Sequence, residues 1–223
     1  MIKPKSFYIT GRSSQAGYTI LEGVMAIVVA SVMLALVGPV IAFSVGTRVQ
    51  AKRVELSAQA GKTYIDAVKS NIVTDKLGVV TRPTPKTTAL QSVAAPNTGT
   101  LDCIAGKLCT TPTSPDYQLY CVDFDGDGTC TTNSVTDMIV QGAAYHPTAT
   151  DPKVGYSLGV RVYRANSFAA DITLTQPPIK SNSLVTNALG DRKLPLAQMT
   201  TEVSPSSGTS SFNDLQNRLK TSP

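Results

Sequence analysis

The sequence has very little histidine and few charged side chains, and these shortages exclude most enzyme classes. His146 is the only histidine in 223 residues, so no Ser-His-Asp or Cys-His catalytic set is evident. It stands directly before a proline and is interpreted as a loop residue. No glycine-rich phosphate loop follows a predicted strand, and only 16% of the residues are charged. The sequence therefore predicts a protein that is not an enzyme.

The charge that is present does not indicate a nucleic-acid partner. The formal net charge is +5, but Lys3, Lys5 and Arg12 in the first 17 residues account for three of it. The remaining positive charge is too small to favour binding to nucleic acid. Thr, Ser, Ala and Pro are plentiful, and this composition suits an exported, partly β domain better than a cytosolic enzyme.

One long segment has no charged residue at all. The run from Gly23 to Thr47 is uncharged, and Glu22 stands immediately before it. A helix of about 20 apolar residues crosses a bilayer, so this segment is long enough. Placing an ionised carboxylate at the edge of such a segment in lipid costs free energy, so Glu22 is expected to pair with a positive charge. Cleavage after Gly17 would supply one, because it would create an α-amino group on Tyr18.

The stretch from Ala16 to Glu22 resembles the class III signal of type IV pilins and pseudopilins. In that family a short basic leader ends in Gly, the mature chain begins with an aromatic residue, and its fifth residue is Glu. Gly17, Tyr18 and Glu22 match these places, although Phe is more usual than Tyr at the first one. Thr19 occupies the second mature position, and Pro39 falls about midway along the apolar segment. The resemblance covers roughly residues 1–72.

This resemblance implies both a processing pathway and a set of partners. A membrane-embedded prepilin peptidase would cut after Gly17 and methylate the new amine of Tyr18. The mature chain would cross the inner membrane once, with its head domain in the periplasm. It would then join other pilin or pseudopilin subunits on an assembly platform, forming an extracellular or envelope-spanning filament. Glu22, Thr19 and Pro39 would belong to the assembly segment.

Two simpler interpretations of the same segment are weaker. The apolar core of a secretory signal peptide is about 7–15 residues long, which is shorter than this run. A plain single-pass anchor explains the length but not the pairing of Gly17 with Glu22. Counting Lys and Arg at the two ends of the span does not decide its orientation. The four cysteines, clustered within residues 103–130, favour a head outside the cytoplasm.

The predicted fold is α+β, with a long N-terminal helix packed on an antiparallel sheet of three or four strands, as in type IV pilins. Its expected parts are a leader (1–17), an assembly helix (18–47), an amphipathic extension (48–76), a β-rich head (77–199) and a flexible Ser/Thr-rich tail (200–223). The extension carries an apolar stripe at helical spacing. The stripe consists of Val49, Leu56, Ala60, Tyr64, Val68 and Ile72.

Four strands are predicted in the head from alternating or β-branched runs. They are Tyr117–Asp123, Met138–Gln141, Gly155–Tyr163 and Ala169–Thr175. A bend or a locally melted turn is predicted in the helix at Pro39, with a tolerated membrane proline as the alternative. A short helix is predicted near Phe212–Lys220.

An acidic run between two predicted strands resembles the first half of a calcium-binding loop. Asp123, Asp125 and Asp127 stand at alternate positions and are followed by Gly128, which gives the pattern D-x-D-x-D-G. Calcium takes six to eight oxygen ligands, and Thr129 would add its carbonyl. The twelfth position is Ser134 instead of the usual Glu, so Asp137 is the candidate to complete the shell. The alternative is a polar Asp/Gly turn without an ion.

The four cysteines allow three pairings, and the sequential one is preferred. Cys103 would pair with Cys109, and Cys121 with Cys130, so that the second bridge fixes the ends of the acidic run. Zinc is disfavoured because the cysteine spacings miss the usual motif and a single histidine is present.

The sequence thus predicts a structural subunit, a minor pilin or pseudopilin, and leaves two alternatives open. A pseudopilin of a secretion machine and a subunit of a surface pilus are not separated. A membrane-tethered, calcium-dependent binding module for polysaccharide or surfaces is the alternative from another class.

Overall fold

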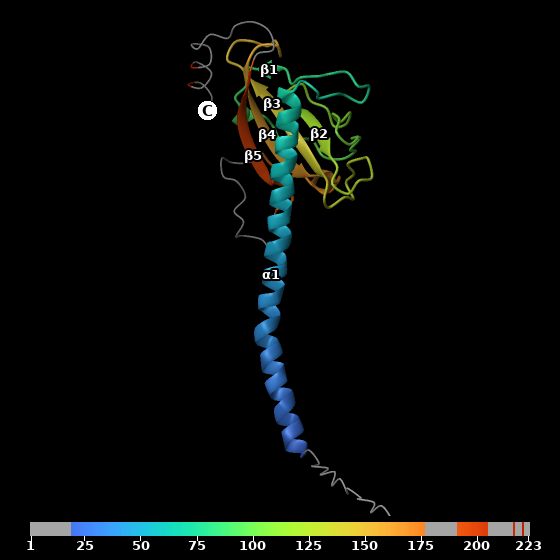
Figure 1. Ribbon diagram of the computed structural model, residues 1–223, viewed down its shortest axis with the longest axis vertical. Coiled ribbons are helices and arrows are strands. Elements are labelled where there is room, and N and C mark those ends of the chain that lie inside the picture. The colour runs from blue at the N-terminus through green and yellow to red at the C-terminus, as the bar shows by residue number, and fades with distance from the viewer. Residues whose placement is uncertain (1–18, 177–190, 205–215, 217–219, 221–223) are drawn as a thin grey trace, which may run out of the picture. The chain divides into compact units, whose positions relative to one another are not determined.

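The computed structural model describes residues 19–176, 191–204, 216 and 220 (Figure 1). The chain divides into two compact units, Met1–Val45 and Gly46–Pro223, which are described separately. The predicted leader, Tyr18, most of the predicted tail and nearly all of the predicted helix near Phe212–Lys220 lie outside the described residues.

Helix α1 spans Ile20–Lys69 and supplies the described part of the first unit. Thr19 caps its first turn, because the Thr19 hydroxyl oxygen accepts a hydrogen bond from the Glu22 backbone N–H at 3.3 Å. The helix passes through Pro39 without interruption. The locally melted turn predicted there is therefore wrong, and the helix accommodates the proline at the cost of one backbone hydrogen bond.

The second unit is built on one mixed sheet of five strands, so the predicted α+β class is confirmed. The strands are β1 (Pro85–Lys86), β2 (Gln118–Val122), β3 (Met138–Tyr145), β4 (Tyr156–Arg164) and β5 (Ala197–Val203). They run in the order β1-β3-β4-β5, and β2 also pairs with β3. Every pairing is antiparallel except β1 with β3, which is parallel. The purely antiparallel sheet of three or four strands is corrected accordingly.

The strand prediction for the C-terminal part of the chain needs two corrections. The predicted strand at 169–175 does not form; the chain there follows the 3-10 helix η2 (Ala165–Phe168) as irregular backbone. Its apolar side chains alternate as in a strand, but they pack on the sheet instead of joining it. The fourth antiparallel strand is β5, which extends four residues into the predicted tail. This strand was not predicted because its Thr, Gln and Glu residues do not form an apolar pattern. At a sheet edge such polar side chains can remain exposed.

The amphipathic extension ends earlier than predicted. Helix α1 stops at Lys69 and not at residue 76, because Asn71 adopts a left-handed conformation with φ of 57°. The backbone N–H groups of Asn71 and Ile72 then bond back to the carbonyls of Val68 and Ala67, at 3.1 and 3.0 Å. This is a common way to terminate a helix. Ile72, the last residue of the predicted apolar stripe, consequently lies beyond the helix and is 64% exposed.

Two hydrophobic clusters cover the two faces of the sheet. On the helix face, the part of α1 within the second unit packs through Ala60, Tyr64 and Val68 against alternate residues of β3 and β4. On the opposite face, called the loop face, the irregular segments and the disulfides pack against the remaining residues of those strands. The alternation of strand side chains produces this division. The two faces of β3 and β4 are therefore both buried.

A glycine allows α1 to approach the sheet closely. A Cβ atom at Gly142 would lie 2.1 Å from the Tyr64 hydroxyl oxygen and 2.4 Å from the ring. Tyr64 is fully buried, and its ring lies 5.4 Å from that of Tyr120, centroid to centroid. The tyrosine ring thus occupies the space that any other residue at position 142 would fill.

Candidate functional site

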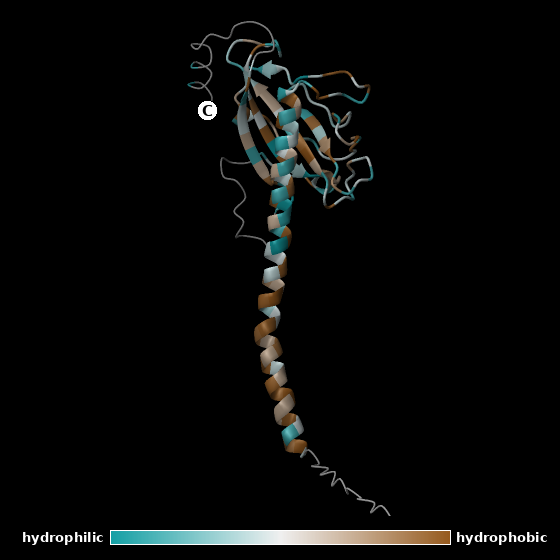
Figure 2. Cartoon of the chain, viewed as in Figure 1, coloured by the Kyte–Doolittle hydropathy of each residue, from teal (hydrophilic) through white to brown (hydrophobic). Residues whose placement is uncertain are grey.

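The described part of the first unit is an apolar helix whose side chains lie in the open. Every described side chain from Thr19 to Val45 is exposed. The mean hydropathy of its most apolar window is 2.7, and none of that window is buried (Figure 2). By length and composition α1 is able to cross a membrane, as an anchor or as part of an export signal. So large an apolar surface requires a lipid or protein covering.

Glu22 is the single charged residue among the described residues that precede Arg48. It lies in the first turn of α1, where the partial positive charge of the helix dipole favours a carboxylate. The Glu22 backbone is fixed by Thr19, as described above. Gly17 and Tyr18, predicted as the cleavage and methylation positions, lie outside the described residues.

The cysteines form two disulfides in the predicted sequential pairing. Cys103 bonds to Cys109 and Cys121 bonds to Cys130, with sequence separations of 6 and 9 residues. Cys121 belongs to β2 and Cys130 follows the acidic run, so the second bridge joins the two ends of that run. The loop between them is thereby held at both ends against the sheet.

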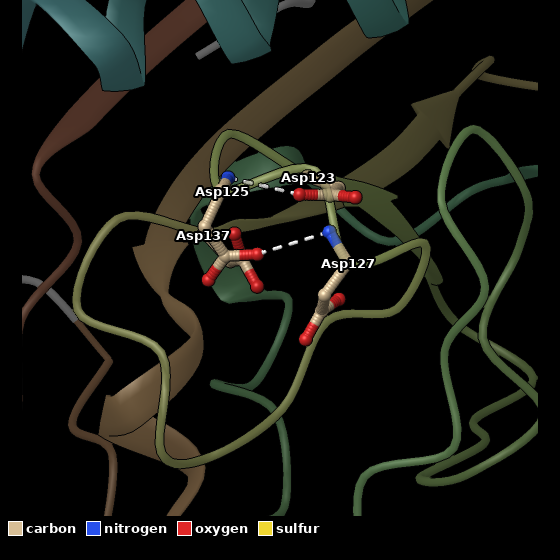
Figure 3. A group of neighbouring side chains, drawn as sticks. All are labelled: Asp123, Asp125, Asp127 and Asp137. Atoms are coloured by element: carbon tan, nitrogen blue, oxygen red, sulfur yellow. Dashed lines mark hydrogen bonds between the residues drawn. The ribbon is translucent and has the colours of Figure 1, made fainter.

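The acidic side chains predicted as metal ligands do come together. Carboxylate oxygens of Asp123, Asp125, Asp127 and Asp137 all lie within 4.8 Å of one another (Figure 3). The first three belong to the loop after β2, and Asp137 directly precedes β3. Because β2 and β3 are antiparallel neighbours, residues at these two strand ends meet. The group is defined here as the acidic loop site.

Asp123 organises the loop through backbone hydrogen bonds. One carboxylate oxygen accepts the N–H groups of Asp125 and Gly126, at 2.9 and 2.6 Å, and the other accepts that of Gly128 at 2.8 Å. Gly126 and Gly128 have φ values of 82° and 87°, which favour glycine. The N–H groups of Gly126 and Gly128 lower the pKa of Asp123, so this carboxyl is ionised.

Asp137 has the opposite environment. It is fully buried, and its Oδ1 accepts the Phe124 N–H at 3.1 Å. Its Oδ2 is buried with no hydrogen-bond partner among the described residues. Burial, aided by the nearby charges of Asp125 and Asp123, raises the pKa of Asp137, although the hydrogen bond from the Phe124 N–H acts in the other direction. An unsatisfied buried carboxylate oxygen beside three other acids is a position that a cation would stabilise.

Two further residues complete the loop. Thr129, predicted as a carbonyl ligand, directs its N–H and hydroxyl to Asp127 Oδ1, at 2.8 and 3.1 Å. Ser134 was not predicted as a site residue. Its hydroxyl donates to Asp125 at 2.7 Å and accepts the Asp137 N–H at 3.2 Å, so it joins the two halves of the site. The signal for Ser134 was its place at the twelfth loop position, where calcium loops carry Glu.

His146 is held by a turn. It is buried, and its Nδ1 accepts the backbone N–H groups of Thr148 and Ala149, at 3.1 and 2.8 Å. The imidazole thus closes the turn that follows β3, and the prediction of a loop residue is confirmed.

Comparisons with protein-family models, with curated proteins and with solved structures each find no match to this chain. The architecture itself, a long apolar N-terminal helix whose continuation packs on a sheet, is compatible with a pilin-like fold. The class that the chain's own features define is therefore an α+β protein with a membrane-competent helix and a disulfide-bonded head.

Proposed function

We propose that this protein is a structural subunit, a minor pilin or pseudopilin, of a type IV pilus-like filament. The observation that carries the proposal is the exposed apolar helix with one carboxylate in its first turn. A head that folds on its own core and a separate, uncovered apolar segment are what a subunit needs if it passes from a membrane into a helical fibre.

The chemistry of assembly would centre on Glu22. In lipid, its ionised carboxylate lacks water and is costly. The α-amino group of Tyr18, created by cleavage after Gly17, would offer the matching positive charge on a neighbouring subunit. Pairing the two would relieve the desolvation of the carboxylate and fix the axial register of the subunits. Thr19, by capping the helix, keeps the backbone at Glu22 helical up to this point.

The first experiment is N-terminal mass analysis of the protein isolated from its native envelope. A chain that starts at methylated Tyr18 supports the proposal. An intact Met1, or a cut near residue 40, would exclude it and leave a tethered or secreted domain. Sheared surface filaments containing the chain would distinguish a pilus from a pseudopilus, in which the chain stays in the envelope and its loss impairs secretion.

A second candidate function rests on the acidic loop site. The alternative is a membrane-tethered module that binds polysaccharide or surfaces in a calcium-dependent way. Its support is the convergence of Asp123, Asp125, Asp127 and Asp137, together with the unpartnered buried oxygen of Asp137. Hard carboxylate oxygens suit calcium, which would neutralise their mutual repulsion.

Calcium binding is compatible with both candidate functions, so it does not choose between them. Calorimetric titration of the full chain in detergent micelles would measure it, with Asp137→Asn as the variant expected to lose affinity. A tether whose N-terminus is uncut and whose surface binding disappears on chelation would favour the second candidate.

A further inference from the structure

Basic side chains follow the apolar segment of α1 at once. Thr47 is the last residue of the uncharged run, and Arg48, Lys52 and Arg53 come within the next six positions. At 1.5 Å per residue, all three lie within about 9 Å of Thr47 along the helix axis. The head-group layer of a bilayer is about 5–8 Å thick on each side. When α1 crosses a membrane, these cations therefore lie at or just beyond the lipid head groups.

The sheet contributes a fourth cation to the same end of the second unit. Arg164 is the last residue of β4, and Val160 and Val162 of that strand belong to the helix-face cluster. Because side chains alternate along a strand, Arg164 also lies on the helix face. Only 4% of it is exposed. Arg53 lies one helical turn before the buried Ser57, on the side of α1 that packs on the sheet.

Arg192 brings a fifth cation to this place. It is exposed in the segment that leads to β5, and its Nη2 donates to the carbonyl of Asn166, two residues beyond Arg164. Burial, followed by the charges of Arg53 and Arg192, lowers the pKa of Arg164 to about 10, whereas Asp191 acts in the other direction. Three guanidinium groups thus lie close enough to repel one another. An anion beside them would relieve this repulsion.

The positive charge of this group exceeds the negative charge beside it. The group, called the basic cluster, consists of Arg48, Lys52, Arg53, Arg164 and Arg192. Two acids interact with it: Glu55 pairs with Lys52 at 3.1 Å, and Asp191 acts on Arg164. These seven side chains carry a net charge of +3. The acidic loop site follows β2, which lies on the other side of β3 from β4.

We propose that the basic cluster binds the phosphodiester head groups of anionic lipids in the bilayer that α1 crosses. A guanidinium group matches phosphate with two parallel hydrogen bonds and is more weakly hydrated than an ammonium group. The three arginines that meet here therefore suit a partly buried contact with phosphate. The inference rests on the membrane stage of the proposed function, but it makes no use of cleavage, methylation or filament assembly.

The test uses the full chain reconstituted in phosphatidylcholine vesicles at low ionic strength, with spin-labelled lipid as the probe. Electron paramagnetic resonance separates labelled lipid in contact with the protein from labelled lipid in the bulk bilayer. We expect labelled phosphatidylglycerol to be preferred over labelled phosphatidylcholine by about fivefold or more, the effect of one basic residue near an anionic surface. Salt at about 0.5 M should remove most of this preference, because it shortens the Debye length to about 4 Å.

Protein variants assign the preference to the basic cluster. Arg53→Gln/Arg192→Gln should reduce it to about twofold or less, because two of the three converging guanidinium groups are lost. The matched control Lys62→Gln/Lys69→Gln removes the same charge from exposed positions farther along α1 and should leave the preference intact. The salt dependence of the unaltered chain tests the same contact without any substitution.

Three results would overturn the inference alone. The first is that both labelled lipids contact the protein to the same extent. The second is a preference that survives Arg53→Gln/Arg192→Gln. The third is a preference that millimolar inorganic phosphate abolishes while chloride of equal ionic strength does not, which would assign the cluster to free phosphate.

A failure of the membrane stage has a different signature. If neither labelled lipid contacts the protein, α1 does not enter the bilayer. That result would overturn the membrane placement in the proposed function, and the lipid contact of the basic cluster with it.

Discussion

Opening the Cys121–Cys130 disulfide should both destabilise the second unit and weaken calcium binding at the acidic loop site. The bridge closes a loop of nine residues around Asp123, Asp125 and Asp127. Chain-entropy reasoning gives such a loop about 2.6 kcal/mol of stabilisation at 25 °C. At about 2–4 °C per kcal/mol for a chain of this size, the double variant Cys121→Ala/Cys130→Ala should melt about 5–10 °C lower.

The expected loss of calcium affinity follows from the same loop-closure free energy of about 2.6 kcal/mol. If the freed loop must be ordered again on binding, affinity falls by up to about 80-fold, which corresponds to 2.6 kcal/mol. Calcium at about 100 times the dissociation constant stabilises the parent protein by about 2.7 kcal/mol. At the same concentration the double variant would gain only about 0.5 kcal/mol. Its calcium-induced rise in melting temperature should shrink from about 5–11 °C to about 1–2 °C.

The matched control is Cys103→Ala/Cys109→Ala. That bridge closes a loop of six residues and should contribute about 2.2 kcal/mol, so both variants lose similar stability. The assay is differential scanning calorimetry of each full chain in detergent micelles, with calcium and with chelator. If calcium raises the melting temperatures of the two double variants by equal amounts, the acidic loop is not the binding site. The same conclusion follows if calcium raises the melting temperature of none of the three proteins.

Three other predictions address the helix, the core and the pH response. Glu22→Ala should leave processing intact but reduce filament yield at least about tenfold. The control Glu55→Ala, on the same helix, should not reduce the yield. Filaments of Glu22→Ala at wild-type yield would contradict the assembly mechanism. Gly142→Ala should cost about 3 kcal/mol in urea unfolding, because its Cβ would overlap Tyr64, and Tyr64→Leu should restore at least half of that loss. Burial raises the pKa of Asp137, so the folded protein without calcium gains stability as the pH falls through that pKa, whereas calcium affinity decreases over the same range. Calorimetric titrations between about pH 7 and 4.5 should show the decrease beginning above the usual Asp value of about 3.9, and Asp137→Asn should remove it.

Much of the fold could be predicted where local pattern and tertiary role agree. Strands β2 and β4 carry apolar alternation that matches the division of their side chains between the two hydrophobic clusters, and the sequence places them to within one residue. The helix was predicted because an uncharged run and an amphipathic run follow each other. Its end was missed because it depends on the left-handed conformation of Asn71, a residue with no unusual neighbours in sequence.

The errors share a physical cause, which is long-range context. Residues 169–175 alternate like a strand, yet they lie on the loop face as cover for the sheet. Strand β5 has polar side chains because it occupies an edge. Its sequence alone does not predict a strand, because its role depends on pairing with β4. The same holds for the acidic loop site: its aspartates were predicted from spacing, but the buried oxygen of Asp137 and the bridging role of Ser134 depend on the antiparallel pairing of β2 with β3.

The position of β5 has a consequence for biogenesis. Central strand β4 is completed only by residues 197–203, and Leu196 and Val203 bury their side chains in the helix-face cluster. A nascent chain from which these residues have not yet emerged exposes one edge and part of one face of β4. The second unit therefore completes its sheet only after residues 197–203 have been synthesised and have paired with β4. A product truncated before β5 would leave this apolar surface uncovered and would therefore be prone to aggregation.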